Sequence, residues 1–318
     1  MIPEPVSMIW YILRDVCLPI LLVIGFGWFF DRRYKIDLES LVKLNLYLFV
    51  PAFIFVRVTQ SEVATRMGLS IVGFTVTMIL SMGLLSLIIA QFRGYPPEHK
   101  KTLLLSSMFY NCGNYGIPLT ALAFPSVGPG VQVFCLMTMN IATFSLGLML
   151  ASAKPCPQNR SIRLNLNPVF KQPSLYAIFT AILLKTTSVP VQDFIFIWKP
   201  AEFLADALVG LALVTLGVQL SKTKRTTFRG PLVWALTIRL LAGPACALGL
   251  TALFGFEPAI AAVLILGAAA PTAVNTALLA HEFEADSQTA AAVVFYSTLL
   301  SFIPVALILL WIRLSWTL

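Results

Sequence analysis

The stretch Asn111-Cys112-Gly113-Asn114-Tyr115-Gly116-Ile117-Pro118 interrupts a long apolar run of the chain. Its glycines and its proline would destabilise a continuous helix by several kcal/mol, because each Gly costs about 1 kcal/mol and Pro about 3 kcal/mol. Backbone groups freed inside hydrocarbon are costly unless they face protein or water. The stretch therefore predicts a membrane helix that is broken half-way. Pro118 is predicted to lie in the first turn of the second half, where a missing N–H is tolerated.

A second stretch, Pro271-Thr272-Ala273-Val274-Asn275-Thr276, has the same character in a later apolar run. Asn114 and Asn275 are 161 residues apart, and the same offset relates Gly94 to Gly255, which precede the two runs. With five apolar segments in each half, an odd number, two similar halves would enter the membrane from opposite sides. The spacing predicts an inverted-topology repeat, a common plan among secondary transporters. Its halves are expected at 1–153 and 172–318, with a cytoplasmic linker at 154–171.

Composition places the chain in the membrane. Of its 318 residues 58% are hydrophobic and 11% are charged, whereas a soluble domain has about 25% charged residues. A transmembrane helix needs roughly 20 mostly apolar residues. Ten apolar segments are predicted near 9–30, 38–57, 67–91, 101–125, 131–153, 173–190, 201–220, 230–254, 258–281 and 287–312. The expected fold is an all-α membrane protein of ten transmembrane helices in two inverted repeats, whose broken fourth and ninth helices cross near the midplane.

The basic residues predict the orientation of these helices. With the N-terminus outside, fifteen Lys and Arg residues fall on the inner side, against five on the outer side, namely Arg57, Arg66, Lys185, Lys199 and Arg313. Cytoplasmic loops carry the excess of positive charge, so both termini are expected outside the cytoplasm, in the cell (inner) membrane. Because the net charge of +8 is spread between apolar runs, it does not indicate a nucleic-acid site. Met1–Ser7 has no basic residue, which favours a retained first helix over a signal peptide.

Motifs for catalysis, metals or cofactors are missing from the sequence. The five cysteines are far apart and form no C-x-x-C pair, so neither a disulfide framework nor a zinc site is expected. His281-Glu282 lacks the second His of a zinc-protease motif, since Ala285 stands in its place. No G-x-S-x-G or Walker A sequence is present. We therefore expect no enzyme, no metal and no cofactor, and a transporter driven by ion or solute gradients.

The two predicted breaks have a chemical consequence. The second half-helix of each broken span would begin near the midplane, so that two helix N-termini, with free N–H groups and partial positive charge, face one another. Such a site suits an anionic group such as a carboxylate, and asparagine amides add donors. The alternative is that both are ordinary Pro and Gly kinks. The residues expected to contact solute or to shape the site are Asn111, Gly113, Asn114, Tyr115, Gly116, Pro118, Pro271, Thr272 and Asn275.

Charged residues inside apolar segments are candidates for coupling transport to an ion. Arg239 lies mid-way along its segment, where a charge costs roughly 2.5–3.5 kcal/mol on insertion scales. It is expected either to attract substrate or couple to protons, or to form a structural ion pair. Asp206 is a possible partner for it. Asp15, beside Arg14 near the outer end of the first segment, is a second proton-coupling candidate.

Three stretches of the sequence resemble the auxin efflux carrier family, which includes bacterial malonate- and malate-type carriers and the plant auxin exporters. The resemblance rests on Asn111–Pro118, on Pro271–Glu282 (PTAVNTALLAHE) and on Leu48–Phe55 (LFVPAFIF). It implies ten helices in two inverted halves, split into a scaffold and a moving transport domain. Asn111 matches a family asparagine that contacts a substrate carboxylate, and Pro118 and Pro271 match the family's prolines at the helix crossover.

Two departures from the plant members qualify this resemblance. Plant carriers have a second proline where this chain has Asn275, and many have a long central loop that is absent here. Both departures favour a bacterial-type carrier of small organic anions over an auxin exporter. A sodium-coupled symporter of the bile-acid type, a channel and a solute receptor remain alternatives. The expected partners are an organic-anion substrate, protons, the lipid bilayer and a second copy of the chain in a homodimer.

Overall fold

The computed structural model describes residues 5–316 apart from 62–64, 153–169, 224–229 and 284. The described residues are almost entirely helical, and their one β-type pairing is an isolated bridge between Tyr110 and Thr272. The predicted all-α class is therefore confirmed. The predicted linker at 154–171 lies, up to residue 169, outside the described residues.

Each predicted apolar segment is occupied by helix, and several helices pass through a π-helical turn. The first half comprises α1 (Pro5–Tyr11), η1 (Ile12–Cys17), α2 (Leu18–Tyr34), α3 (Leu38–Leu44), η2 (Asn45–Phe49), α4 (Val50–Gln60), α5 (Thr65–Phe92), α6 (Pro97–Met108), η3 (Cys112–Gly116), α7 (Ile117–Ala123), α8 (Gly128–Ala142), η4 (Thr143–Gly147) and α9 (Leu148–Ser152). The second comprises α11 (Pro173–Thr186), η5 (Val191–Asp193), α12 (Ile195–Lys222), α13 (Gly230–Thr237), η6 (Ile238–Ala242), α14 (Gly243–Phe254), α15 (Pro258–Ala268), α16 (Val274–Glu282), α17 (Ser287–Leu300) and α18 (Phe302–Ser315).

Local sequence explains several of the ends. Asp37 caps α3 by accepting hydrogen bonds from the backbone N–H groups of Glu39 and Ser40, which have no partner within the helix. Asp286 caps α17 in the same way. Gly255 ends α14 at φ +66°, a left-handed conformation that glycine adopts without steric cost.

Six helical stretches of the described residues are long and apolar enough to span a membrane, at 7–34, 38–60, 66–92, 128–151, 195–222 and 230–254. Helices α17 and α18 make a seventh if counted as one span bent by 42°. The three other predicted segments contain shorter helices. Those predicted at 101–125 and 258–281 are each divided by non-helical backbone, and α11, in the segment predicted at 173–190, has only 14 residues. The chain is therefore a multi-pass membrane protein by length and composition of its helices.

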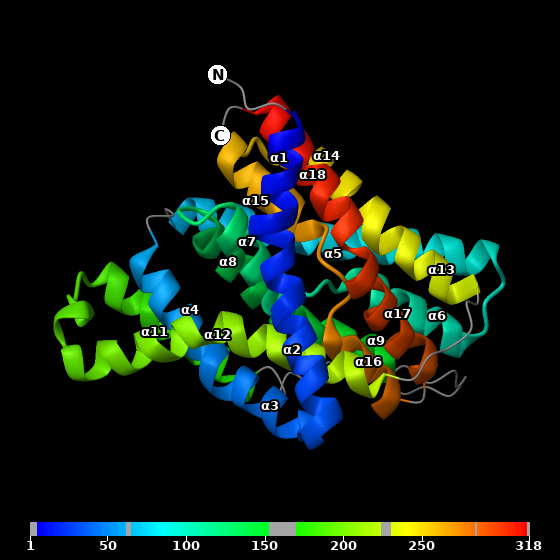
Figure 1. The fold of residues 1–318 in the computed structure, drawn as a ribbon, viewed down its shortest axis with the longest axis horizontal. Helices are drawn as coiled ribbons and strands as arrows, with labels where there is room; N and C mark the ends of the chain where they lie inside the picture. The colour runs from blue at the N-terminus through cyan, green and yellow to red at the C-terminus, as the bar shows by residue number, and fades with distance from the viewer. Residues whose placement is uncertain (1–4, 62–64, 153–169, 224–229, 284, 317–318) are drawn as a thin grey trace, which may run out of the picture.

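The helices pack in two groups. Helices α2, α4, α11 and α12 contact one another, and we call them the α12 group. Helices α5, α6, α8, α13, α14, α15 and α17 form the second, which we call the α5 group. Figure 1 shows α4, α11 and the start of α12 on one side of the molecule and α6, α13 and α17 on the other, with α2 crossing between them. The buried apolar residues form two clusters. One, around Phe74 and Val263, lies within the α5 group, whereas the other, around Phe53 and Leu216, joins the α12 group to buried residues of α6 and α8.

Glycines bring α2 and α12 into backbone contact. A Cβ atom added at Gly27 would lie 2.3 Å from the carbonyl oxygen of Val214, and one at Gly217 would lie 2.1 Å from that of Ile24. Real Cβ atoms do not approach that closely, so only glycine allows this separation. Close approach through small residues is a usual way for membrane helices to associate, because lipid offers no hydrophobic driving force between them. The α12 group is consequently a tightly packed unit.

Candidate substrate site at the crossing of two interrupted helices

The first interruption separates α6 from η3. Backbone from Phe109 to Asn111 is non-helical, and the helix resumes at Cys112. Asn111 is the N-cap: its side-chain Oδ1 accepts a hydrogen bond from the N–H of Asn114 at 3.0 Å. This break confirms the sequence expectation, with one correction. Pro118 is not in the first turn of the second half, because a π-helical turn starts at Cys112 and Pro118 follows it as the second residue of α7.

The second interruption separates α15 from α16. Helix α15 ends at Ala268 and α16 begins at Val274, so Pro271 lies in the non-helical backbone as the sequence predicts. Thr272 holds this segment in place through two hydrogen bonds. Its Oγ1 donates to the carbonyl of Ser106 at 2.8 Å, and its N–H donates to Oγ of Ser297 at 3.1 Å.

The two interruptions cross and pair with each other. The N–H of Asn111 donates to the carbonyl of Pro271 at 2.7 Å, and the N–H of Ala273 donates to the carbonyl of Phe109 at 2.9 Å. Each broken helix therefore satisfies backbone groups that the other one frees, which would be costly if left unpaired inside a membrane. The pairing also brings the starts of η3 and α16 to one place.

A small pocket lies at this place. Its volume is about 50 Å³, which is room for a few water molecules or one carboxyl group. The side chains with amide or aliphatic hydroxyl groups that line it are mostly asparagines, and they come from η2, η3, α8, η4, α16 and the backbone before η3: Asn45, Asn111, Asn114, Asn140, Thr143 and Asn275. Among the residues that the structure describes, no Asp, Glu, Lys or Arg lines it. Any ligand must therefore be recognised by neutral hydrogen-bonding groups and by helix ends.

Hydrogen-bond donors in the pocket are left free. Asn111 is only 6% exposed, yet its Nδ2 has no hydrogen-bond partner among the described residues, and the same holds for the buried Nδ2 of Asn140. Buried polar groups in proteins are normally paired. The N-terminus of α16 is also open, since no side chain caps it at Ala273. Unpaired donors beside an uncapped helix N-terminus favour an anionic ligand.

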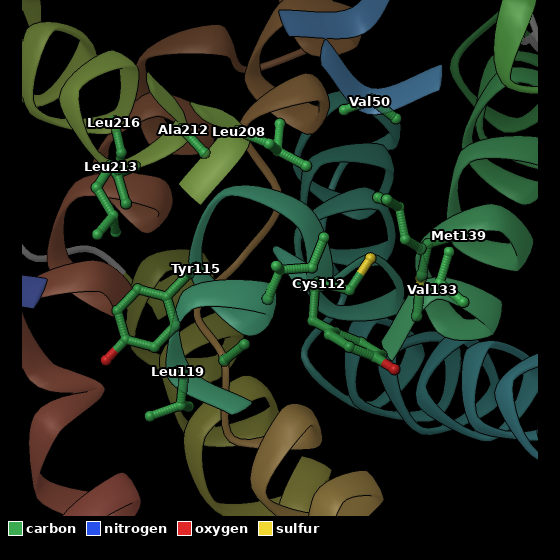
Figure 2. Close-up of a cluster of buried hydrophobic side chains, with 14 of the residues drawn as sticks. Val50, Cys112, Tyr115, Leu119, Val133, Met139, Leu208, Ala212, Leu213 and Leu216 are labelled. Atoms are coloured by element: carbon green, nitrogen blue, oxygen red, sulfur yellow. The ribbon is translucent and has the colours of Figure 1, made fainter. Parts of the chain in front are cut away.

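Apolar packing closes the crossing on its other sides. Figure 2 shows Cys112 on the side of Val133 and Met139, which belong to α8, whereas Tyr115 lies on the other side of the same turn. The Tyr115 hydroxyl is within hydrogen-bond distance of Oγ of Ser301, at 3.0 Å. Leu213 and Leu216 of α12 belong to the same buried cluster. The η3 turn is thus held between α8 and α12.

Comparison with known proteins agrees with this architecture. The model of a family described as "Membrane transport protein", the auxin efflux carrier family, matches residues 15–153 and 158–309. The chain belongs to this family. It is 27% identical over 308 residues to an uncharacterized transporter of Methanocaldococcus jannaschii, covering 92% of this chain and 96% of the relative. It is 25% identical over 275 residues to an uncharacterized transporter of Methanothermobacter thermautotrophicus, covering 85% and 88%.

Membership of the membrane transport protein family confirms the resemblance seen in the sequence and identifies a membrane transporter. Of the residues expected at its site, Asn111, Gly113, Asn114 and Asn275 line the pocket. The other expected residues do not line the pocket: Pro271 and Thr272 lie in the second interruption, and Tyr115, Gly116 and Pro118 follow the first one, in η3 and α7. Gly116 lies against Gln132. An added Cβ would lie 2.5 Å from its Nε2, so the amide that donates to the carbonyl of Cys112 would have to move.

Arg239 acts on the transporter's two interrupted helices from outside the pocket. It lies in the π-helical turn η6 and is completely buried. Its Nη1 donates to the carbonyl of Ser107 at 3.0 Å, near the end of α6, and its Nη2 donates to that of Ala268 at 2.7 Å, the last residue of α15. Its guanidinium also lies 5.1 Å from the ring centre of Tyr110. One cation thus caps the C-terminal ends of both first half-helices, where the helix dipole is negative.

The expected pairing of Arg239 with Asp206 is wrong. Asp206 forms its ion pair with Arg57, at 2.8 Å, because α12 and α4 are neighbours. Asp15 forms an ion pair with the adjacent Arg14, at 2.9 Å. Neither Asp206 nor Asp15 lines the pocket, so a coupling role for either stays a prediction.

Sequence reasoning missed Asn45, Asn140 and Thr143. Asn45 lies in the π-helical turn η2 and Thr143 in η4, and such turns are frequent at functional sites. Both asparagines stand alone in apolar segments. That isolation is the signal that could have identified them, because polar residues inside membrane helices usually face a partner or a pathway.

Proposed function

We propose that this transporter carries small organic anions, carboxylates above all, across the cell membrane by alternating access around the pocket at the crossing. One observation carries the proposal: the buried Nδ2 of Asn111 has no partner and lies in the lining of a pocket onto which the uncapped start of α16 opens. A carboxylate would accept hydrogen bonds from both.

The electrostatics of the crossing support an anion. A negative group at a helix N-terminus is stabilised by about 0.3–1 kcal/mol when exposed and by up to about 2 kcal/mol when partly buried. The N-termini of η3 and α16 meet at the pocket. The C-terminal ends of α6 and α15, which carry partial negative charge, are neutralised by Arg239. The fixed charges near the crossing are thereby arranged for one negative ligand without an ionised side chain in the pocket.

The packing supports motion between two bodies. We propose ten spans in two inverted repeats. The α12 group is the scaffold, and the α5 group, which includes α6 and α15 of the interrupted helices, moves against it. The pocket is lined by both parts, since Asn45 and Val50 belong to the segment that continues into α4. A second hollow, of about 680 Å³, is lined by Arg57 and Gln60 at the other end of α4 and by Glu257 at the start of α15. The two hollows lie at opposite ends of α4 and of α8, which suits alternating exposure of one site.

The proposal also covers the orientation of the chain in the membrane and the source of energy for transport. The distribution of basic residues favours both termini outside the cytoplasm, and the family resemblance favours proton coupling or facilitated efflux over sodium. The substrate-binding role of the crossing residues and a homodimeric assembly complete the hypothesis.

A binding screen followed by a transport assay tests the proposed function. Purified protein is heated with mono- and dicarboxylates, and the best stabiliser is used in counterflow with proteoliposomes, with and without a sodium or proton gradient. We expect saturable counterflow that Asn111→Ala abolishes and that Gln91→Ala, which removes an exposed amide at the end of α5, leaves unchanged. Binding without counterflow would indicate a receptor, and flux that does not saturate would indicate a channel.

A further inference from the structure

A crevice separate from the crossing lies on the outside of the helix bundle. It has a volume of about 350 Å³ and is lined by Val58 of α4, by Gly68, Leu69 and Val72 of α5, by Phe134 and Met137 of α8, and by four residues of α11. Those four are Ile178, Ile182, Lys185 and Thr186. The crevice therefore lies between the α12 group and the α5 group.

Most of the lining is apolar, and its outer part faces the surroundings of the bundle. Leu69 is 67% exposed and Ile182 is 40% exposed, and in a membrane protein such side chains face lipid chains. The floor is formed where the Phe134 ring lies over Gly68, since a Cβ at that glycine would be 2.7 Å from the ring. A pocket with this lining binds hydrocarbon rather than a polar solute.

Lys185 gives the crevice one charged end. It is the penultimate residue of α11, it is exposed, and it donates one hydrogen bond to the carbonyl of Ser61. An ammonium group has three N–H donors, so, as far as the described residues are concerned, two remain for another acceptor. Ile178 lies seven residues earlier, which is about 10 Å along the helix. The crevice thus runs from a cation at the end of a membrane helix inward along an apolar path.

We propose that this crevice binds an anionic phospholipid, with one hydrocarbon chain between α11 and the α5–α8 pair and with the phosphate on Lys185. The cation lies at the end of the membrane helix, where a lipid carries its phosphate, and the apolar lining lies further inward, where a lipid carries its hydrocarbon chains. A lysine near a helix end extends its ammonium to the headgroup region, which in the predicted orientation belongs to the outer leaflet, and a lipid phosphate there accepts a charge-assisted hydrogen bond from it. The bound chain fills the seam between the two helix groups. This inference does not depend on the substrate of the transporter.

Thermal unfolding of delipidated protein tests the lipid site. Phosphatidylglycerol and phosphatidylcholine with identical chains are added separately to protein in detergent. We expect phosphatidylglycerol to raise Tm more than phosphatidylcholine does, and Lys185→Gln, which keeps a donor for Ser61 but removes the charge, to abolish that difference. Lys199→Gln is the matched control, because Lys199 is an exposed lysine paired with Glu202, and it should preserve the difference.

A second variant tests the apolar part. Val72→Phe narrows the crevice without changing charge, and we expect it to reduce by at least half the number of phosphatidylglycerol molecules retained in native mass spectrometry. Equal Tm shifts for the two lipids in the unmodified protein would overturn the proposal. So would a full phosphatidylglycerol preference in Lys185→Gln, or unchanged lipid retention in Val72→Phe. Equal shifts produced by glycerol phosphate, which has no chains, would also overturn it in favour of a simple phosphate contact.

Discussion

Asn45 donates a hydrogen bond from its side-chain Nδ2 to Oδ1 of Asn114 at 2.9 Å. The two residues are far apart in sequence, and the bond joins the η2 turn, which packs against α12, to the η3 turn of the first interrupted helix. It therefore connects the proposed scaffold with the proposed moving part. It also orients Asn114 in the pocket, while the Oδ1 of Asn45 remains without a hydrogen-bond partner among the described residues.

Replacing Asn45 with Ala should weaken substrate binding. The change leaves the Oδ1 of Asn114 without its donor, and a neutral hydrogen bond contributes about 1 kcal/mol, which corresponds to roughly a fivefold change in Kd. Titration calorimetry with the carboxylate found in the screen measures this change. An unaltered Kd would show that the Asn45–Asn114 bond does not orient the site.

Two substitutions at Asn111 should separate its structural role from its binding role. Asn111→Asp keeps an oxygen to accept from the N–H of Asn114, and Asp is as good an N-cap as Asn. It replaces the free Nδ2 donor by a negative charge, which repels an anionic substrate. We expect a near-normal Tm and a more than tenfold loss of transport in Asn111→Asp, whereas Asn111→Ala loses both the cap and the donor. Transport by Asn111→Asp at the normal rate would exclude an anion at this position.

Arg239→Met should lower the stability of the fold, which is measured as a lower Tm. It removes two hydrogen bonds from a charged donor, each of which contributes about 1.5–3 kcal/mol, and leaves the carbonyls of Ser107 and Ala268 without them. Gly243→Ala should act in the same direction, because its Cβ would lie 2.4 Å from Nη2 of Arg239. Thermal unfolding checks both, with Arg93→Met, at an exposed position in the described structure, as the control. A normal Tm combined with lost transport in Arg239→Met would instead assign the cation to the transport cycle.

Gly217→Ala should loosen the contact between α2 and α12. The added methyl group would lie 2.1 Å from the carbonyl of Ile24, so the helices must separate, and overpacking of this kind costs typically about 1–3 kcal/mol. Gly210 lies in the same helix, and its Cβ would meet nothing within 4 Å. Gly210→Ala should therefore be neutral or slightly stabilising. Equal Tm values for the two variants would contradict close packing at Gly217.

Local composition was sufficient to predict the membrane class, the helical segments, both interruptions and the family. These properties depend on residues that are adjacent in sequence: an apolar run is buried in lipid whatever its neighbours, and clustered Gly, Asn and Pro destabilise a helix wherever it packs. The prediction that Asn111, Asn114 and Asn275 lie together also depended on such a cluster in each half.

Packing between distant helices determined the rest. Asn45 and Asn140 reach the pocket because α12 packs against both η2 and η3, and α8 packs against η3. Arg239 has two backbone carbonyls as partners in place of the expected carboxylate of Asp206. A single asparagine or arginine in an apolar run must find a partner because burying it alone is costly. Which partner it finds depends on how helices from different parts of the chain rotate and cross, and that geometry follows from the whole set of packed side chains.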